Sequence, residues 1–441
     1  MRIELVSAAA EDSARLTPLA LATLAALIPP DMEVHFSDDQ LSPIDLHNGF
    51  PGADLVAISV LSKTAHRAYA IADACRKKGI QVVLGGIHPT VLPEEASTHA
   101  DAVVIGEAEI LWPRLLEDFR ANHLQKFYRQ EGWVDMNRYP APRRTIFQPY
   151  SHSYVPLDVV QTTRGCPFHC DFCTVNSVFG SPFRMRDIEK VIAEVRELKR
   201  WGILLADDNV IGNVPYFQKL FTALEPLKLQ WIGEASLAGL DHDQNLKILQ
   251  RSGCKALFIG FESLSPQLKT TGKTQNHPDQ YREIIHKLHD HGIIVYAAFM
   301  FGFDFDDPTI FERTVEFAIA NKIILAQFAM LTPYPGTRLY SRLKAEGRLL
   351  RDQWWLFPNQ EILAPHFRPL AMEAEQLREG WKWAWKEFYS FSSIWKRMDF
   401  WPALYPYLAY LPFNLRQRHF ARYKICAEHT RPRSWKGQAA A

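Results

Sequence analysis

Three cysteines, Cys166, Cys170 and Cys173, stand close together in a run that directly follows an apolar segment, residues 157–160. Because a [4Fe–4S] cluster normally takes four cysteine thiolates, a C-x3-C-x2-C loop leaves one iron without a protein ligand and open to a small molecule. S-adenosylmethionine suits that iron, since its amino and carboxylate groups can chelate the metal while the cluster delivers an electron to the sulfonium. The spacing therefore predicts a 5′-deoxyadenosyl radical, which is the chemistry of the cofactor rather than of the protein.

Two other interpretations of the cysteines stay open, a zinc site and three unrelated core side chains. A closed structural zinc site takes four ligands, usually as two separated pairs, and the chain has no second C-x2-C pair. His169 could supply a fourth ligand, although its neighbours in the same tight loop already point at one centre. We favour the cluster because of the spacing and of the strand expected before it.

The run from Arg164 to Cys173 resembles the cluster loop of the radical S-adenosylmethionine superfamily, in which an aromatic residue commonly precedes the third cysteine. Phe172 occupies that position. The resemblance implies that the cysteines hold the cluster and that Phe172 contacts the adenine of the cofactor. A plain core phenylalanine would explain the same residue.

The composition is typical of a globular protein, because 47% of the 441 residues are hydrophobic and 22% are charged. The length exceeds one ordinary domain. A formal net charge of +1 and the lack of a helix-turn-helix signature give no reason to expect nucleic acid as a partner. The remaining cysteines, Cys75, Cys254 and Cys426, are scattered singly, so we expect a reducing, cytoplasmic location. The first residues do not resemble a signal peptide.

Residues 1–145 alternate short apolar strands with helical patterns, which predicts a parallel, doubly wound, Rossmann-like α/β domain. Strands are expected at 3–7, 33–36, 54–59, 81–85 and 101–105, and helices at 14–27, 65–78 and 108–119. Ligands of such sheets bind beyond the carboxyl ends of the strands. The candidate binding residues at those ends are Ser59, Gly85, Gly86, His88, Gly106 and Glu107.

The segments 85–95 and 101–107 resemble the cobalamin-binding domain that precedes many radical S-adenosylmethionine domains. The resemblance implies cobalamin as a cofactor, with the Gly-Gly pair after the fourth strand allowing a close approach. The D-x-H-x-x-G pattern that places a histidine beneath cobalt in other cobalamin proteins is missing, because residues 37–41 contain no histidine. We therefore expect either a cobalt without a protein histidine underneath or a domain retained as a scaffold. His88 is interpreted as a wall residue rather than a cobalt ligand.

Residues 120–156 contain four prolines and few periodic apolar positions, so we expect a surface linker. A second βα series fills residues 155–345, with strands expected at 157–162, 203–207, 230–235, 256–262, 294–302 and 325–331. Helical spacing recurs between them, for example at 188–198 and 311–320. Six units are too few for a closed eightfold barrel. The sequence predicts a partial (β/α)6 barrel, open along one side, with its chemistry at the carboxyl ends of the strands.

Polar residues and glycine end several of these strands, namely Asp208, Glu234, Glu262 and Gly302. The carboxylates could accept hydrogen bonds from the methionine amine or the ribose hydroxyls, and the glycine lets the backbone approach the adenosyl group. By resemblance, the second and fourth strand ends are where the superfamily contacts S-adenosylmethionine. The alternative is that each carboxylate merely caps the next helix. Tyr334 could face substrate, although a rigid Pro-Gly turn explains the same residues.

Residues 346–441 change character and form an expected helical C-terminal extension rich in aromatic residues. Its tryptophans include Trp354, Trp355, Trp381, Trp383, Trp385, Trp395 and Trp401. The apolar stretch 400–413 is interrupted by prolines and too short to span a bilayer. Aromatic residues beside Lys382, Lys386, Arg416, Arg418 and Arg422 indicate peripheral membrane contact or a greasy substrate entrance. A helical cap over the open side of the barrel is the plainer interpretation.

Taken together, the chain resembles the cobalamin-binding, class B-like radical S-adenosylmethionine methyltransferases. The resemblance implies reductive cleavage of S-adenosylmethionine and cobalamin-dependent methyl transfer to an unactivated carbon or phosphorus. The substrate would be a small molecule, or a lipid-like one because the tail is similar to that of relatives acting on polycyclic lipids. An electron donor such as flavodoxin or ferredoxin is implied as a partner. A radical cyclase or rearrangement enzyme that does not methylate, and a non-catalytic cofactor-binding sensor, are the alternatives.

Overall fold

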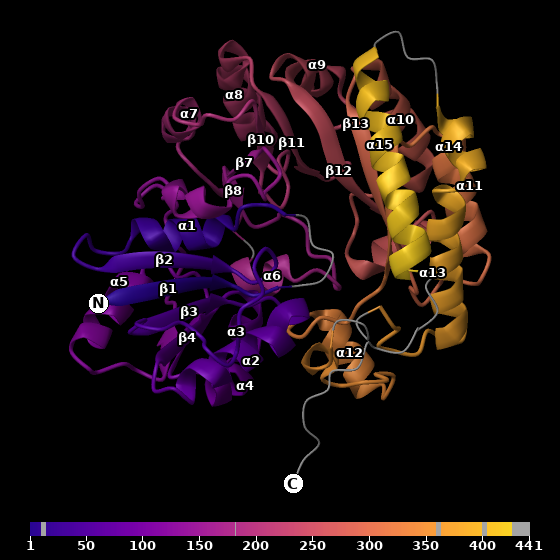
Figure 1. The fold of residues 1–441 in the computed structure, drawn as a ribbon. Helices are drawn as coiled ribbons and strands as arrows, with labels where there is room; N and C mark the ends of the chain where they lie inside the picture. Colours follow the sequence, from indigo (N-terminus) through magenta and orange to yellow (C-terminus); the bar gives the residue numbers. More distant parts are fainter. Residues whose placement is uncertain (10–14, 181, 359–362, 399–403, 426–441) are drawn as a thin grey trace.

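The first third of the chain builds a six-stranded parallel sheet in the order β2-β1-β3-β4-β5-β6 (Figure 1). This computed structural model describes residues 1–9, 15–180, 182–358, 363–398 and 404–425. The strands are β1 (Arg2–Ser7), β2 (Glu33–Asp38), β3 (Leu55–Ser59), β4 (Gln81–Gly85), β5 (Ala102–Ile105) and β6 (Phe127–Arg129). Only β6 was unexpected, because a three-residue strand with one buried side chain has no periodic pattern.

Neighbouring residues along the first strand pack against helices on opposite faces of this sheet. Ile3 and Leu5 lie in one hydrophobic core with α1 and α5, whereas Val6 lies in a second core with α2 and α4. A strand covered on both faces requires apolar residues at successive positions. The helices are α1 (Leu19–Ala26), α2 (Ala65–Arg76), α3 (Ile87–Val91), α4 (Pro93–His99) and α5 (Leu111–Arg120). The predicted doubly wound arrangement is confirmed, although α1 begins only after Pro18 and the expected start at residue 14 lies outside the described residues.

A second parallel sheet follows, in the order β14-β13-β12-β11-β10-β7. Its strands are β7 (Asp158–Val160), β10 (Gly202–Leu205), β11 (Gln230–Ala235), β12 (Cys254–Glu262), β13 (Ile294–Phe301) and β14 (Leu325–Met330). Its helices are α7 (Ile188–Arg196), α8 (Val214–Leu224), α9 (Asp243–Arg251), α10 (Tyr281–Asp290) and α11 (Ile310–Ala320). Within the described part of the chain, β7 and β14 pair on one side only, so the predicted open barrel of six units is confirmed.

A small antiparallel sheet, which the sequence did not predict, frames the cysteine loop. β8 (Thr163–Arg164) precedes the loop and β9 (Arg184–Met185) follows it, with Thr163 opposite Met185. α6 (Val175–Phe179) lies between them and begins two residues after the last cysteine. Two-residue strands carry no alternating pattern, so tertiary contacts decide their pairing. The two ends of the loop are thereby joined.

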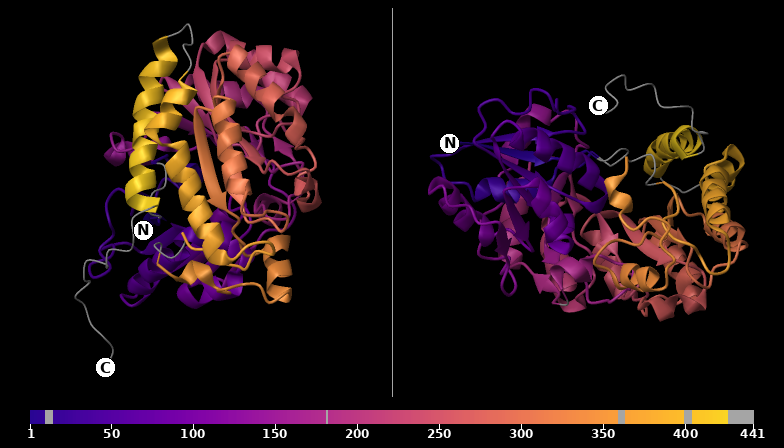
Figure 2. Two further views of the ribbon diagram at one scale, coloured as in Figure 1. Left: turned by 90° about the vertical axis from the view of Figure 1, so that its right-hand side faces the viewer. Right: turned by 90° about the horizontal axis from the view of Figure 1, so that it is seen from below.

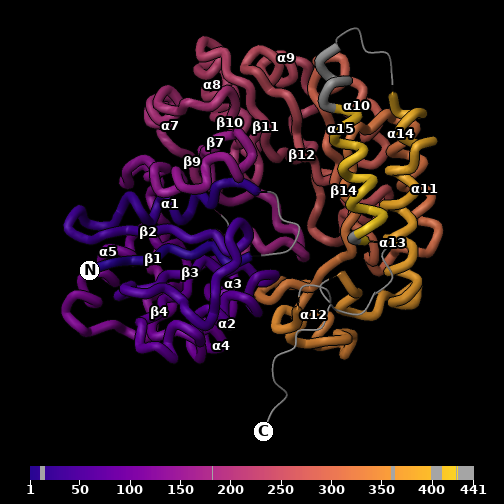
Figure 3. The backbone as a smooth tube through the Cα atoms, in the orientation of Figure 1, coloured from indigo at the N-terminus to yellow at the C-terminus, as the bar shows by residue number. Residues whose placement is uncertain are grey.

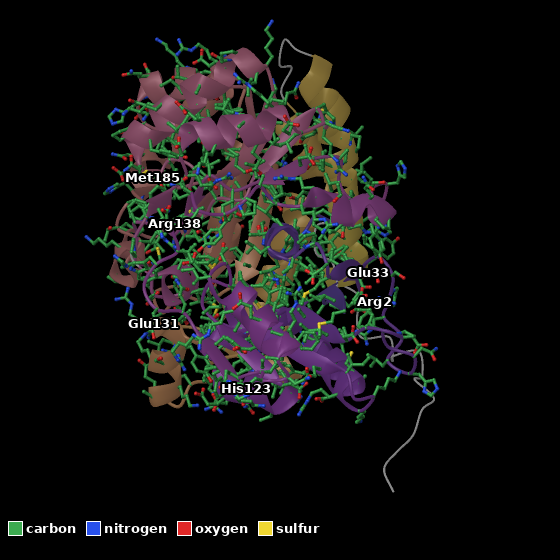
Figure 4. The ribbon with its side chains drawn as sticks, turned by 90° about the vertical axis from the view of Figure 1, so that its left-hand side faces the viewer. Arg2, Glu33, His123, Glu131, Arg138 and Met185 are labelled. Carbon is green, nitrogen blue, oxygen red and sulfur yellow. The ribbon has the colours of Figure 1, made fainter. Side chains whose placement is uncertain are left out.

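The segment that connects the two sheets runs along one side of the molecule and contacts the barrel. It includes a 3-10 turn, Arg144–Tyr150. Asn137 accepts a hydrogen bond from the backbone N–H of Asp187 at 2.6 Å. Figure 4 shows Glu131 and Arg138 along the same edge as Met185 of β9. The expected linker is therefore docked against the barrel over part of its length.

The C-terminal helices cover part of the barrel. They are α12 (Arg338–Ala345), α13 (Ala374–Phe388), α14 (Phe391–Arg397) and α15 (Leu404–Phe420), which continues into a π-helical turn (Ala421–Ile425). Figure 2 shows the last of these helices, in yellow, alongside the barrel sheet. The indole N–H groups of Trp381 and Trp385 both donate to the carbonyl of Phe328 in β14, at 2.8 Å. Among the described residues, no helix is both long enough and apolar enough to cross a membrane.

The chain after α12 returns to the first domain before it reaches α13. Trp354 and Trp355 are buried in the second hydrophobic core of the first sheet. The indole of Trp355 donates a hydrogen bond to Glu95 of α4 at 3.0 Å. Figure 3 shows the orange segment around α12 beside the indigo α2 and α3. The C-terminal region therefore contacts both sheets.

Candidate functional site

The carboxyl ends of the two sheets meet. α3, which follows β4, packs against α6, which follows the cysteine loop (Figure 1). Gly336, in the turn after β14, lies against the side chain of Val91 at the end of α3. Parallel sheets bind their ligands at the carboxyl ends of the strands. Groups bound at these two edges are therefore neighbours.

The three cysteines are half-buried on one loop. Burial, together with the other thiols of the loop, raises the pKa of the Cys170 thiol to about 11 and that of the Cys173 thiol to about 12. All three are free of disulfides. Because a metal binds the thiolate form, a bound centre has to stabilise three negative charges here.

Two aspartates at the end of β10 hold the residues that enter the cysteine loop. Asp207 is buried, and its carboxylate accepts the backbone N–H of Thr162 at 2.6 Å and that of Thr163 at 3.0 Å. The neighbouring Asp208 accepts the N–H of Gly165 at 3.0 Å. Loss of hydration raises the pKa of Asp207 to about 6. The backbone just before the first cysteine is thus fixed.

The other side of the loop is held by more distant parts of the chain. The carbonyl of His169 lies against Gly272, where a Cβ atom would collide with it. Arg338 of α12 donates a hydrogen bond to the same carbonyl. The N–H of Asp171 donates to the carbonyl of Thr271 at 2.8 Å. Anchors on both sides present the thiols in a fixed arrangement.

The donor set fits an iron–sulfur cluster. Each of the three thiols can bind a different iron of one cluster. In the described residues, no three His, Cys, Asp or Glu side chains are grouped so as to hold a single metal ion. The charge of Lys273 lies near Cys170 and Cys173, where it favours the thiolates. His169, considered above as a zinc ligand, is exposed to solvent.

A buried ion pair stands at the end of β12. Nζ of Lys273 lies 2.6 Å from Oε1 of Glu262, and both side chains are about nine-tenths buried. Glu262 has a left-handed backbone with φ of 63°, which is strained for a residue with a side chain. A Cβ atom at Gly260 would overlap the Glu262 carboxylate. Asn276 donates to the carbonyl of Gly260 at 2.9 Å, so the strand end is built around this pair.

Glu234, at the end of β11, reaches solvent but lies at the carboxyl edge beside these groups, where the surrounding protein atoms reduce its hydration. Loss of hydration, together with the carboxylates of Asp208 and Glu262, raises the pKa of Glu234 to about 7. The structure thus brings these three sequence-predicted carboxylates together. The Glu234 carboxylate can accept hydrogen bonds from an amine or from hydroxyls and can exchange a proton near neutral pH.

Two other predicted residues lie against protein. At Gly302, the end of β13, the side chains of Leu377 and Phe367 occupy the space next to the missing Cβ atom. Phe172 is half-buried and packs edge-on against Phe303, with ring centroids 5.8 Å apart. The close packing of α13 therefore explains why a glycine stands at residue 302. Phe172 joins the cysteine loop to the barrel core.

The predicted residues of the first domain lie on neighbouring loops at its carboxyl edge. Ser59 ends β3, Gly85 ends β4 and is followed by Gly86, and Gly106 follows β5. Gly86 has φ of 108°, and a Cβ atom there would lie 2.9 Å from the carbonyl oxygen of Val60. Only glycine fits this turn without strain. The turn brings bare backbone to the edge where a ligand binds.

Apolar side chains border the same edge. Leu61, two residues beyond β3, is 39% exposed, and Ile110, five residues beyond β5, is 49% exposed. Ligand sites combine apolar walls with a few polar groups. Backbone turns next to exposed apolar side chains fit the broad, flat ring of cobalamin.

His88 is completely buried at the wall of the first domain. Its Nδ1 lies 3.1 Å from the hydroxyl of Ser62, and its Nε2 lies 3.0 Å from the carboxylate of Glu95. Glu95 also accepts hydrogen bonds from the Tyr69 hydroxyl at 2.9 Å and from the Trp355 indole at 3.0 Å. Both ring nitrogens of His88 are therefore engaged by protein, and neither is available to cobalt in this arrangement.

Glu107 joins the two domains through buried ion pairs. Its carboxylate contacts Arg164, which precedes the cysteine loop, and Arg184 of β9, the latter at 2.5 Å. Arg164 also pairs with Glu109 at 2.8 Å. Burial alone would raise the pKa of Glu107, but the charges of these guanidinium groups lower it. Glu107, Glu109, Arg164 and Arg184 are called the interdomain ion cluster below.

Sequence reasoning missed the positioning roles of Arg164, Arg184 and Lys273. Arg164 gave a weak signal, because it stands two residues before the first cysteine. Its partner Glu107 is 57 residues away, and Arg184 lies 77 residues from the same carboxylate. A single sequence carries no sign of pairing over such separations.

Comparison with protein families gives a match for each part of the molecule. Residues 7–116 match the B12 binding domain, and residues 160–318 match the Radical SAM superfamily. Residues 337–434 match a domain of unknown function, DUF4070. The first match covers β2 to β5 of the first sheet, and the second covers the cysteine loop and β10 to β13 of the barrel.

Similar proteins extend these matches over most of the chain. The bacteriochlorophyllide d C-12(1)-methyltransferase of Chlorobaculum tepidum is 32% identical over 391 residues, which are 87% of this chain and 84% of the relative. The hopanoid C-2 methylase of Rhodopseudomonas palustris is 26% identical over 403 residues, 88% of this chain and 74% of the relative. The structure of the radical S-adenosylmethionine methyltransferase TsrM from Kitasatospora setae, with cobalamin and a [4Fe–4S] cluster bound, has a TM-score of 0.67 at 15% identity, covering 90% of this chain and 89% of that one.

These similarities agree with the geometry of the two facing edges. A methyltransferase that is 32% identical along nearly the whole chain establishes kinship, and the two family matches name the cofactor-binding parts. The chain belongs to the radical S-adenosylmethionine methyltransferases that carry a B12-binding domain, and its cofactors are a [4Fe–4S] cluster, S-adenosylmethionine and cobalamin.

Proposed function

We propose that this enzyme cleaves S-adenosylmethionine reductively at the cysteine loop and transfers a methyl group to an unactivated carbon, or a phosphorus, of an apolar small molecule. The observation that supports this most is the meeting of the two carboxyl edges, which Arg164 and Glu107 join. When bound, the cluster supplies the electron for cleavage and cobalamin carries the methyl group. A substrate held between the two edges is close to both, which lowers the entropic part of the barrier.

The barrel edge offers groups for each part of S-adenosylmethionine. Cys166, Cys170 and Cys173 hold the cluster. Glu234 reaches solvent at this edge and accepts a hydrogen bond from the methionine amino group, with Asp208 beside it. The Glu262–Lys273 pair sets the charge of the strand end. Phe172 and Gly302 act through packing at the border of the site rather than through polar contacts.

The first domain contributes the cobalamin side. The loops at Ser59, Gly85, Gly86 and Gly106 present backbone to the cofactor, and His88 serves as a wall residue with both nitrogens engaged. His88 would then not serve as a ligand of cobalt. The extents of the sheets support domains at residues 1–145 and 155–345, with a C-terminal extension at 346–441.

The relatives and the proposed reaction also indicate the kind of substrate and a second partner. The names of two relatives mention bacteriochlorophyllide and hopanoid, which are multi-ring apolar molecules, and they support an apolar or lipid-like substrate here. Because cleavage of S-adenosylmethionine consumes one electron, we include a low-potential donor such as flavodoxin or ferredoxin as a partner. The single, scattered cysteines outside the loop support a cytoplasmic location.

The cluster assignment is tested by Cys170→Ala, with Cys254→Ala as the matched control. Cys254 is buried at the start of β12, away from the carboxyl edge. Both variants are purified anaerobically, reconstituted and reduced, and 5′-deoxyadenosine is measured by mass spectrometry. We expect Cys170→Ala to lose product formation and Cys254→Ala to retain it. Robust product formation by Cys170→Ala would refute the assignment.

Methyl transfer is tested by the cobalamin content of the purified protein, normalised to its iron. Near-equimolar cobalamin together with transfer of an isotope-labelled methyl group supports the proposal. Production of 5′-deoxyadenosine without retained cobalamin would favour a cyclase or rearrangement enzyme instead. S-adenosylmethionine that stays intact under strong reduction would favour a sensor.

A further inference from the structure

Positive charge is concentrated in the last part of the chain. Residues 381–441 contain eleven Lys and Arg but only three Asp and Glu, a net charge of +8. Since the whole chain has a net charge of +1, residues 1–380 carry −7. The stretches 388–398 and 404–425 contain no acidic residue at all. Such an asymmetry indicates a negatively charged partner for the C-terminal helices.

The same helices expose large apolar side chains. Phe391 and Trp395 of α14 are 63% and 72% exposed, and Leu411 and Leu415 of α15 are 45% and 40% exposed. Residues four positions apart lie on one side of a helix. Each helix therefore carries an apolar pair on its outer surface.

A cation–π contact brings the two outer surfaces together. The guanidinium of Arg418 lies 3.8 Å from the centre of the Phe391 ring. Arg418 follows Leu415 by three positions, so it continues the side of α15 that carries the apolar pair. The left panel of Figure 2 shows the yellow C-terminal helices along one outer edge of the molecule. We call this surface the basic aromatic face, formed by Phe391, Trp395, Leu411, Leu415, Arg416, Arg418 and Arg422.

The inner side of these helices is already docked. Arg397 of α14 is 2% exposed, and its guanidinium donates to the carbonyls of Ile323 and Ile324 at 2.9 Å and to Asn414 of α15 at 3.0 Å. The basic aromatic face is therefore not the surface that these helices bury against the barrel. Because these partners of Arg397 are neutral oxygens, its charge adds to the positive potential of the face.

We propose that the basic aromatic face binds the surface of an anionic lipid membrane. Aromatic and leucine side chains fit the boundary between headgroups and acyl chains, while the arginines pair with lipid phosphates. The net charge of +8 matches a negative surface, and the exposed apolar pairs match a boundary that is apolar beneath. The contact is peripheral, and it does not depend on which reaction the enzyme catalyses.

The test is sedimentation of the full-length protein with vesicles of phosphatidylcholine alone or mixed with phosphatidylglycerol, at low and high salt. The variant combines Phe391→Ser with Trp395→Ser, and the control is Trp201→Ser, since Trp201 is 57% exposed but lies before β10. We expect binding only to the anionic vesicles, weakening with salt, and about tenfold weaker for the double variant. The control should bind like the wild type.

Equal binding of the wild type and the double variant, or equal binding to neutral vesicles at all salt concentrations, would overturn the proposal. A dimer in analytical ultracentrifugation that the double variant breaks, with no vesicle binding, would assign the face to a second copy of the chain instead. A charge variant, Arg416→Glu with Arg422→Glu, keeps the test valid if the apolar variant fails to fold, because both arginines are exposed. It should lose binding to anionic vesicles as well.

Discussion

At the scale of single residues, Glu107 is the carboxylate that joins the first domain to both ends of the cysteine loop. Its buried carboxylate compensates two arginines of the other domain, one of which stands immediately before the cysteine loop. A buried ion pair contributes little net stability compared with an apolar substitute, but removing one partner leaves an uncompensated charge, which costs about 3–5 kcal/mol. The interdomain ion cluster therefore couples the first domain to the cysteine loop.

Glu107→Gln should destabilise the protein by about 3 kcal/mol, because Arg184 loses the carboxylate it pairs with and Arg164 is left with Glu109. Urea unfolding of the cofactor-free protein measures this loss. Hydrogen exchange in residues 163–173 should become faster in the variant. Glu131→Gln, at an exposed position, should change stability by less than about 0.5 kcal/mol. Equal effects of the two substitutions would show that the ion cluster does not hold the loop.

Glu234 gives the site a pH dependence. Its pKa of about 7 means that the carboxyl is mostly protonated at pH 6 and mostly ionised at pH 8, as follows from a single titration. Since the ionised form accepts hydrogen bonds from the methionine amino group, affinity for S-adenosylmethionine should rise between these pH values by up to about tenfold. In Glu234→Gln the rise should be smaller. Calorimetric titration of both proteins checks this, and parallel pH profiles would contradict it.

The raised pKa of Glu234 also makes the stability of the protein depend on pH. The folded pKa of Glu234 lies above 4.5, the ordinary pKa of a glutamate carboxyl, so between these values the folded protein binds more protons than the unfolded chain. Stability contributed by this group therefore falls as the pH rises through this window. Glu234→Gln should gain stability relative to the wild type as the pH rises from 5 to 8, which urea unfolding at both pH values would measure.

Residue-scale chemistry was predictable where its members are close in the sequence. The cysteines lie within one short run, so their spacing alone indicated a cluster. The pairing of Lys273 with Glu262 spans 11 residues and needs the left-handed backbone at Glu262. A glutamate in the sequence does not predict that backbone conformation. The burial of His88 between Ser62 and Glu95 also depends on the tertiary structure.

At the scale of elements, the turn between β4 and α3 shapes the edge of the first sheet. Gly86 there has both a left-handed backbone and a carbonyl oxygen in close approach. Gly79, before β4, has φ of 75° but nothing within 4 Å of a Cβ atom. Gly86 combines this contact with a φ of 108° and a ψ of −167°, which essentially only glycine adopts, whereas Gly79 has a positive φ without the contact.

Gly79→Ala should cost about 1 kcal/mol, the price of a left-handed backbone for alanine. Gly86→Ala should cost more, about 2–4 kcal/mol, because the Cβ atom also meets the carbonyl of Val60. Thermal or urea unfolding of the two variants gives the difference. Similar losses would mean that the turn relaxes away from Val60 without penalty.

Long periodic elements were predictable, and short ones were not. β1 and β3 bury almost all of their residues, and β12 and β13 alternate buried residues with less buried ones, so both kinds of apolar run stand out in the sequence. β6, β8 and β9 have two or three residues each and form only because a neighbouring strand is in place. Gly302 was expected to face the adenosyl group, but the neighbour that fills its space, Leu377, belongs to a helix 75 residues later.

At the scale of the whole molecule, the segment around Trp355 ties the C-terminal region to the first domain. Its indole donates to Glu95, which also bonds His88 and Tyr69. A hydrogen bond to a charged acceptor contributes about 1.5–3 kcal/mol. The contact couples the barrel cover to the wall of the proposed cobalamin site.

Trp355→Phe should keep most of the apolar packing but lose this hydrogen bond, and destabilise the protein by about 2 kcal/mol. The unfolding transition of the first domain should separate from that of the barrel in calorimetry. Trp201→Phe, at an exposed site, is the control and should leave a single transition unchanged. An unaltered transition in Trp355→Phe would show that the domains are coupled elsewhere.

The same contact sets an order of events during synthesis. Trp354 and Trp355 complete a core whose last strand, β5, ends at residue 105, so the 248 residues 106–353 are made in between. At about 5–20 residues per second, this takes on the order of ten to fifty seconds. During that interval the first domain leaves the ribosome with the core on one face of its sheet only partly covered, by α2 and α4 but not by the two tryptophans. Its maturation is completed only by the last quarter of the chain, and a fragment that ended with the barrel would release an unfinished first domain.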